Sequence, residues 1–237
     1  TYSLRLLPVG GYCAMEGEEE NSNDPRALNN KGFWAKLLIF AAGAIMNFIT
    51  GLVIILVLYA GAQAFYTPTI TGFADTCPLQ GEAGLQTGDR LLSIDGERIY
   101  VYSDVSLLLG RNRTGVYDLV VRRDGQRVRL KDFPMERREY VDQSGQTYTG
   151  FGLYFDVEEA TFTGRIAYSW NNAVDFVRTV RLSLQMLLGG EAGLKDVSGP
   201  VGIVTTITDV GQSASSASAA AQDIAYLAAL IAVNLAV

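Results

Sequence analysis

An uninterrupted apolar stretch at residues 37–66 constrains the fold more than any other feature of this sequence. No charged residue occurs between Lys36 and Asp75. A helix needs about 20 apolar residues to cross a hydrocarbon core about 30 Å thick, and this stretch is longer than that. The sequence therefore predicts a membrane protein with a transmembrane helix within residues 31–66, and the other segments lie on one side of the bilayer or the other.

The charges that flank this stretch indicate its orientation. Lys31 and Lys36 precede it, whereas Asp75 and Glu82 are the first charged residues after it. Cytoplasmic flanks of transmembrane helices carry an excess of Lys and Arg. We therefore expect the N-terminus in the cytoplasm and the segments after Tyr66 on the outer side of the membrane.

One stripe of the predicted helix differs from ordinary lipid-facing surface. Gly43, Asn47 and Gly51 follow each other at intervals of four residues and so share a helix face. Glycines allow a second backbone to approach closely, and an amide needs a partner where water is absent. Helix packing explains the stripe. The alternative is that Asn47 also lines a polar site between helices.

Composition and charge restrict the classes of function. The net charge of −6 argues against nucleic acid as a partner. The two cysteines, Cys13 and Cys77, lie on opposite sides of the predicted span, so we expect neither a disulfide nor a cysteine-based zinc cluster. Histidine is absent, which removes the commonest metal ligand and general base from these residues.

The first predicted element is a β-hairpin within residues 4–15, which read LRLLPVGGYCAM. Two short apolar runs flank Gly10 and Gly11, and a tight hairpin turn requires positive φ at both of its central positions. Pro8 cannot donate a backbone hydrogen bond, so we expect its strand to have an open edge there. We assign residues 1–30 to this hairpin and a solvated acidic loop.

Residues 67–160 have the pattern of a soluble, mainly-β (α+β) domain. Asp95-Gly96 and Asp124-Gly125 are strong hairpin signals, and residues 105–109 suit a short helix. The predicted strands lie at residues 69–73, 90–94, 115–122, 126–131 and 148–157, the last with two glycines at its start.

Two further helices follow, one in residues 161–200 and one in residues 201–237. In the first, apolar residues recur every three or four positions over residues 165–188; the helix lies either on the membrane surface, with Trp170 at headgroup level, or against the protein. The second contains the uncharged residues 224–237, which reach only about 21 Å as a helix. We expect this to be a truncated transmembrane helix, in which Asn234 either packs or lines a site.

Three stretches together resemble one family, the bacterial site-2 proteases, which are zinc intramembrane metalloproteases. LRLLPVGGYCAMEGE precedes a span that contains GAIMNF, and KDVSGPVGIV precedes LAALIAVNLAV. Between them, GEAGLQTGDRLLSIDGERI at residues 81–99 is similar to the core of a PDZ domain. The resemblance implies a multi-domain membrane protein in which transmembrane α-helices accompany a membrane re-entrant β-hairpin and a PDZ domain.

The resemblance also implies a reaction, a cofactor and partners. Members cut transmembrane protein substrates, such as a membrane-held regulator, within the lipid bilayer of the bacterial cell. Their zinc is held by an HExxH motif before the hairpin and an aspartate of an LDG motif after the later helix. This sequence contains no histidine and so cannot form that site. We expect the chain to be an inactive central portion of a zinc-dependent endopeptidase. The alternative is a non-catalytic, membrane-tethered PDZ scaffold.

The family implies two substrate-handling parts. The hairpin is expected to hold an unwound substrate segment against its open edge. The residues of the hairpin and of the span that we expect to contact the substrate are Leu7, Val9, Gly10, Gly11, Tyr12 and Asn47. The PDZ domain is expected either to bind a peptide end or to act as a size filter that excludes large outer domains. The proposed peptide-binding residues are Gly150, Phe151, Gly152, Leu153, Tyr154 and Phe155, with the strand at 153–157 receiving the peptide.

Overall fold

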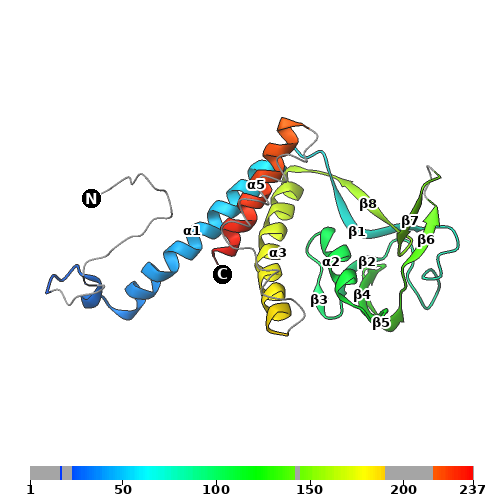
Figure 1. The fold of residues 1–237 in the computed structure, drawn as a ribbon, viewed down its shortest axis with the longest axis horizontal. Coiled ribbons are helices and arrows are strands. Elements are labelled where there is room, and N and C mark those ends of the chain that lie inside the picture. Colours follow the sequence, from blue (N-terminus) through cyan, green and yellow to red (C-terminus); the bar gives the residue numbers. More distant parts are fainter. Residues whose placement is uncertain (1–16, 18–22, 142–144, 190–215, 237) are drawn as a thin grey trace.

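The structure is a computed structural model that describes residues 17, 23–141, 145–189 and 216–236. Three long helices lie side by side, and a β-rich domain lies beside one of them (Figure 1). The predicted hairpin at residues 4–15 falls outside the described residues. Leu7, Val9, Gly10, Gly11 and Tyr12 therefore remain sequence-based predictions.

Helices α1 (Phe33–Tyr59) and α5 (Ala217–Asn234) are, among the described residues, the two that are long and apolar enough to cross a membrane. Only 11% of the most apolar window of each is buried inside the structure, so neither resembles the core helix of a soluble protein. A short 3-10 turn, η1 (Leu28–Asn30), precedes α1. The helix is shorter than the apolar stretch of the sequence, because residues 64–66 already belong to a strand.

The β-rich domain is built on one twisted antiparallel sheet with the strand order β5-β4-β2-β1-β8, in which β3 pairs with β2. A separate pair, β6 with β7, completes it, and the helix α2 (Ser103–Arg111) packs against the sheet. The strands are β1 (Ala64–Phe73), β2 (Arg90–Ile94), β3 (Glu97–Arg98), β4 (Val116–Arg123), β5 (Gln126–Pro134), β6 (Arg138–Val141), β7 (Thr147–Gly150) and β8 (Leu153–Glu159).

The two predicted tight turns are present. Asp95 and Gly96 have φ angles of 50° and 81°, and Asp124 and Gly125 have φ angles of 49° and 79°. Positive φ at both central positions gives the turn a twist that matches the flanking strands, and Asp-Gly tolerates it. The turns join β2 to β3 and β4 to β5. The predicted strand at 148–157 is interrupted at residues 151–152, and its two halves pair with different partners.

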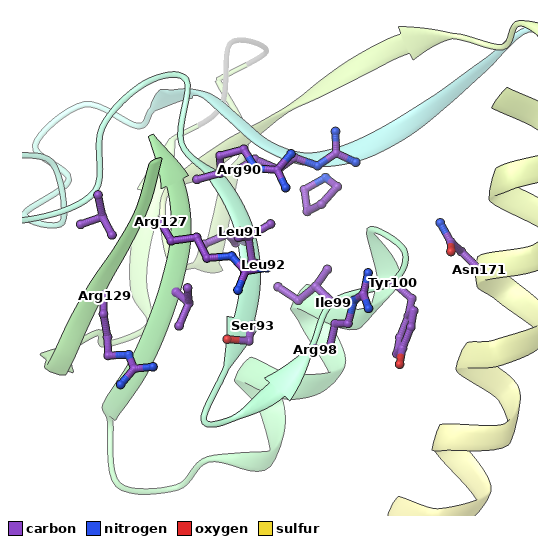
Figure 2. Close-up of a pocket in the computed structure, with 14 residues that line it drawn as sticks. Arg90, Leu91, Leu92, Ser93, Arg98, Ile99, Tyr100, Arg127, Arg129 and Asn171 are labelled. Atoms are coloured by element: carbon purple, nitrogen blue, oxygen red, sulfur yellow. The ribbon is translucent and has the colours of Figure 1, made fainter. Parts of the chain in front are cut away.

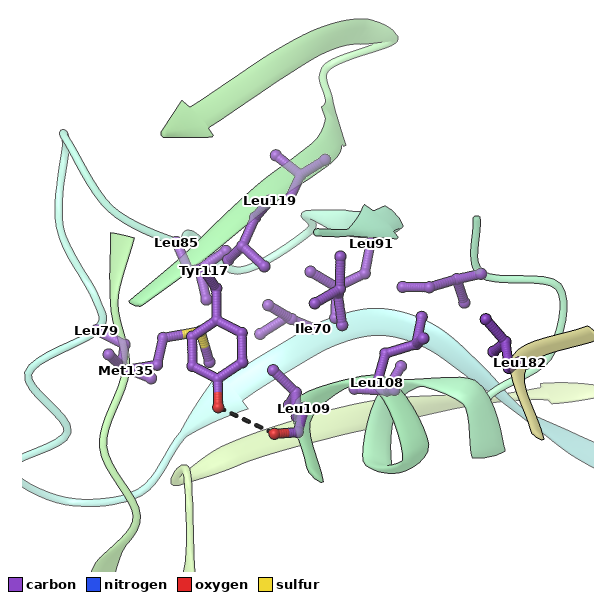
Figure 3. Packing of buried hydrophobic residues seen from close by; sticks show 14 residues of the cluster. Ile70, Leu79, Leu85, Leu91, Leu108, Leu109, Tyr117, Leu119, Met135 and Leu182 are labelled. Carbon is purple, nitrogen blue, oxygen red and sulfur yellow. Dashed lines mark hydrogen bonds between the residues drawn. The ribbon is translucent and has the colours of Figure 1, made fainter. Parts of the chain in front are cut away.

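The core of this domain lies between the sheet and α2. Ile70, Leu91 and Leu119 from three strands meet Leu108 and Leu109 of α2 (Figure 3). Tyr117 lies in the same cluster, and its hydroxyl donates a 2.9 Å hydrogen bond to the carbonyl oxygen of Leu109. Because a buried phenol needs such a partner, this bond fixes the C-terminal end of α2 on the sheet.

Helix α3 (Phe162–Leu188) lies between the β-rich domain and the two candidate spans (Figure 1). Ala173 and Phe176 are buried against Ile55 of α1 and Val233 of α5, whereas Leu182 belongs to the core of the β-rich domain. The sequence left open whether this helix lies on the membrane or on the protein. In the structure it packs on the protein along both of these faces.

Helix α1 approaches α5 most closely at Gly51. A Cβ at this position would lie 2.5 Å from Cγ2 of Val233 and 3.0 Å from the carbonyl oxygen of Ala229, whereas a Cβ at Gly43 would meet nothing within 4 Å. Asn47 donates a 3.2 Å hydrogen bond from Nδ2 to the carbonyl oxygen of Leu235 at the end of α5. These contacts support the helix-packing interpretation of the stripe.

A matched pair of substitutions tests this helix contact. We expect Gly51→Leu to lower the free energy of unfolding by about 1–3 kcal/mol, because the larger side chain overpacks the contact with α5. Gly43→Leu adds the same side chain where space is open, so we expect a change of less than about 0.5 kcal/mol. Equilibrium unfolding in mixed micelles of detergent and dodecyl sulfate measures both, and equal losses would contradict a close α1–α5 contact at Gly51.

Candidate functional site

The six residues predicted to bind a peptide lie in one continuous segment, from the end of β7 through a two-residue loop into β8. Gly152 has a φ of +70°, and a Cβ there would lie 2.7 Å from the ring of Tyr140. Its carbonyl oxygen accepts a 2.8 Å hydrogen bond from the amide of Ala74. Glycine is therefore required for both the backbone conformation and the space, and the loop is held in one shape.

The backbone around this loop offers hydrogen-bond donors. Outside the strand ladders, no described residue accepts a hydrogen bond from the amide of Phe151 or Gly152. Strand β8 is the last strand of the sheet, so only its edge toward β1 is paired among the described residues. An edge strand with free donors and acceptors is a template for an added strand.

Helix α2 lies along the same segment. At one end Tyr102, which precedes α2, contacts Phe155 of β8 with ring centroids 5.1 Å apart. At the other end Phe151 contacts Tyr117 edge to face, with centroids 6.1 Å apart. Phe155 and Phe151 therefore lie near opposite ends of α2, and β8 keeps one edge unpaired among the described residues.

A cavity of about 400 Å³ lies where the loop meets the end of α2. Phe151, Leu109 and Tyr117 line it together with two arginines, Arg113 and Arg137. The guanidinium carbon of Arg137 lies 5.6 Å from the centre of the Phe151 ring. Both arginines are far from the loop in sequence, so no local pattern indicated them. Glu136 also lines the cavity, so the cavity carries charges of both signs, and the two arginines are the groups that a terminal carboxylate would pair with.

A buried cluster of charged groups joins α3 to the β-rich domain. Arg178 donates through Nη2 to Oδ1 of Asp104 at 2.7 Å and to Asp175, and through Nη1 to the carbonyl oxygen of Arg98. The side chains of Arg178 and Asp104 are 5% and 1% exposed. The sequence contains no signal that pairs Arg178 with Asp104. Arg178 lies three residues after Asp175 on α3, a spacing that favours contact between two side chains of a helix, and this is the one local signal of an ion pair.

Burial, followed by repulsion from the Asp104 carboxylate, raises the pKa of Asp175 to about 7, although Arg178 acts in the opposite direction. An Asp in the unfolded chain has a pKa near 3.9. The folded protein thus holds this proton more tightly than the unfolded chain. The contribution to stability is complete below about pH 4 and is lost as pH rises to about 7.

The raised pKa of Asp175 predicts that the stability of the protein depends on pH. We expect the free energy of unfolding to fall between about pH 4 and pH 7, and we expect Asp175→Asn to flatten that fall, because the amide carries no titrating proton. The groups that face Asp175 are Asp104, Arg178 and, from α5, Tyr226. Unfolding midpoints measured across this range check it. The exposed control Asp75→Asn should retain the full slope, and an unchanged slope in Asp175→Asn would contradict the assignment.

The residues that the structure describes do not fit a zinc site. The chain has no histidine, and nowhere in the described part of the chain do three His, Cys, Asp or Glu side chains gather as metal ligands. Cys77 is a free thiol that donates to the carbonyl oxygen of Phe151 at 3.5 Å, so its role is in supporting the loop.

Comparison with known proteins identifies the family to which this chain is similar. Residues 1–237 match the family described as Peptidase family M50. A provisionally named zinc metalloprotease of Clostridium acetobutylicum is 32% identical over 203 residues, which cover 86% of this chain and 58% of that protein. A similarly named protein of Clostridium perfringens is 32% identical over all 237 residues, or 67% of its length.

A protein of Bacillus subtilis named Regulator of sigma-W protease RasP is 28% identical over 203 residues, which cover 85% of this chain and 47% of that protein. The chain thus spans about half to two thirds of the length of these relatives. The match to the family covers the whole chain, and the chain therefore belongs to Peptidase family M50, the family of the site-2 proteases.

Proposed function

We propose that residues 1–237 form the substrate-handling portion of a zinc-dependent endopeptidase that cuts transmembrane proteins within the bilayer. The family match across the whole chain carries this proposal. The relatives named as zinc metalloproteases are longer than the matched region, the chain contains no histidine, and no group of metal ligands occurs among the described residues. The proposal therefore assigns zinc binding to other residues of the full coding sequence, and it expects residues 1–237 alone to be inactive.

The β-rich domain is, in this proposal, a PDZ domain on the outer side of a multi-pass cell-membrane protein. Two features of the described residues support it. Strand β8 is an edge strand that contacts the start of α2 through Phe155 and Tyr102, and a glycine-containing loop with a positive φ precedes it. The Gly88-Asp89 turn also adopts a defined shape, since Gly88 has a φ of 93° and Asp89 is fully buried. We retain four proposed domain boundaries, at residues 31–66, 67–160, 161–200 and 201–237.

The role of the domain is to gate access to the site. It lies against α3, and α3 lies against both candidate spans. A substrate with a large outer domain would collide with a domain held in this position, whereas a trimmed substrate would pass. The re-entrant hairpin at residues 1–30 and Asn47 are proposed to contact the substrate segment in the membrane, although Asn47 has a structural partner in α5.

The enzymatic proposal is tested on the full coding sequence that contains these residues. We expect about one zinc per chain and cleavage of a transmembrane peptide that is abolished when the Glu of an HExxH motif is replaced by Gln. The chain of residues 1–237 alone should bind no stoichiometric zinc and cut nothing. Absence of zinc and of cleavage in the full product would favour the alternative, a membrane-tethered PDZ scaffold.

The cavity beside Phe151 favours peptide-end binding as a second function of the same domain. We expect a peptide with a free terminal carboxylate to bind the chain several-fold more tightly than its terminal amide, because Arg137 and the loop amides contact the charge. Arg137→Gln should remove this preference, whereas Arg138→Gln, on β6 and outside the cavity lining, should retain it. If no terminal carboxylate binds in calorimetric titration, peptide recognition is wrong and gating alone remains.

A further inference from the structure

A groove of about 730 Å³ lies on the opposite side of the sheet from the loop at Phe151. It lies between the outer face of strands β2, β4 and β5 and the helix α3 (Figure 2). Asn171 contributes from α3, and Tyr100 from the segment after β3. We call this space the arginine groove, because five arginines line it: Arg90, Arg98, Arg122, Arg127 and Arg129.

The positive charge in the arginine groove is largely uncompensated. No Asp or Glu is among the residues that line it. Glu158 lies 3.8 Å from Arg90, with both side chains well exposed, and no described carboxylate lies within 4.0 Å of Arg122, Arg127 or Arg129. In a chain of net charge −6, such a concentration of guanidinium groups is a specific local feature. It matches an anion with several oxygen atoms, such as a phosphate.

An apolar groove continues from the arginine groove. It has a volume of about 610 Å³, and Arg98 and Tyr100 line both spaces. Val174, Val177 and Leu184 of α3 line its apolar part, where Leu184 is 51% exposed, and the ion pair of Glu97 with Arg181 lies at its polar border. A charged pocket that opens into an apolar groove is suited to an amphiphile, with an anionic head at one end and a hydrocarbon tail at the other.

The position of both grooves indicates the source of that amphiphile. Each is lined by α3, and the neighbouring face of α3 is packed against α1 and α5, the candidate spans. Packed helices have axes about 8–10 Å apart, so the grooves lie about one helix diameter from α1. A membrane lipid can therefore reach them without leaving the vicinity of the span.

We propose that the arginine groove binds the phosphate headgroup of an anionic phospholipid from the bilayer, with an acyl chain in the apolar groove along α3. The lipid would join the β-rich domain to α3 on the side away from the loop at Phe151. The position of the proposed gate would then depend on the anionic lipid content of the membrane.

The test uses the purified chain in neutral detergent with phosphatidylglycerol or phosphatidylcholine of identical acyl chains, and native mass spectrometry counts the retained lipid. We expect phosphatidylglycerol to be retained preferentially. Each basic residue near an anionic lipid contributes about fivefold in affinity, so Arg127→Gln combined with Arg129→Gln should lower retention about tenfold or more. Arg111→Gln combined with Arg138→Gln removes the same charge from exposed positions outside both grooves and should retain the lipid.

Three outcomes would overturn the proposal. Equal retention of the two lipids would show that headgroup charge is not recognised. Equal losses in the two double variants would show a nonspecific effect of net charge. Displacement of phosphatidylglycerol by glycerol phosphate or by an acidic peptide at comparable concentration would assign the groove to a free anion or to a protein segment. Leu184→Ser should weaken lipid retention without changing the binding of glycerol phosphate, since the serine alters only the groove for the tail.

Discussion

Replacing Arg178 with alanine is expected to lower the free energy of unfolding by about 3–5 kcal/mol, because it leaves two buried carboxylates without their common partner. Asp104 and Asp175 both accept hydrogen bonds from this guanidinium. At side chains that are 1% and 10% exposed, solvent cannot replace the lost hydrogen bonds, and one of the two carboxylates must hold a proton to avoid repulsion from the other. Denaturant titration of the chain in detergent measures the loss.

Arg181 provides the matched control on the same helix. Its Nη2 lies 2.7 Å from Oε2 of Glu97, but the arginine side chain is 50% exposed. Surface ion pairs of this kind contribute about 0–1 kcal/mol, so Arg181→Ala should be nearly neutral. Hydrogen exchange adds a local measurement, since loss of docking should speed exchange in α2 in the Arg178 variant alone. Comparable losses in both variants would contradict a buried junction at Arg178.

Replacing Arg123 with glutamine is the second change with a large expected effect, again about 3–5 kcal/mol. Arg123 donates through Nε and Nη2 to the two carboxylate oxygens of Asp89, at 2.8 and 2.7 Å. The Asp89 side chain is fully buried, and its Oδ2 also accepts from the amide of Gln86. Without the arginine, the Asp89 carboxylate stays buried but loses its bidentate hydrogen-bond partner. The turn before β2, which this carboxylate holds, should then be destabilised.

Arg122→Gln is the control for this position, since Arg122 is the neighbouring residue on β4 and is exposed. We expect a change within about 0.5 kcal/mol. Thermal unfolding followed by circular dichroism compares the two variants. A near-neutral Arg123→Gln would show that Asp89 is not held as a buried charge and would contradict the bidentate assignment.

Local sequence signals were sufficient for most of the secondary structure. The strand at Arg90–Ile94 has the predicted bounds, and α2 and α3 extend the predicted helices by a few residues at their ends. These elements depend on alternation, helical periodicity and Asp-Gly turns, all of which act between near neighbours. The apolar stretch predicted a span but not its end, because hydropathy does not distinguish the last turn of α1 from the apolar start of β1.

The long-range contacts were not predictable in the same way. Arg178 meets Asp104 across 74 positions, and Arg123 meets Asp89 across 34. Nothing in a single sequence pairs one arginine with one of 25 acidic residues. The loop at Gly150–Leu153 was predicted from its glycines, but Arg113 and Arg137 reach it only through the fold. The arginine groove likewise combines strands and a helix that the sequence treats separately.

The most direct test of gating removes the β-rich domain from the full-length protease. Gln63 and Ala160 are joined by a 2.8 Å backbone hydrogen bond, so a Gly-Gly linker can connect them and leave α1 and α3 in place. Asp175→Asn and Arg178→Gln in the same variant avoid exposing unpaired charges on α3. The measurement is the cleavage rate of one transmembrane substrate with and without a folded outer domain. We predict that the intact protease cuts only the trimmed substrate, whereas the deletion variant cuts both at similar rates. Continued discrimination by the deletion variant would contradict gating by this domain.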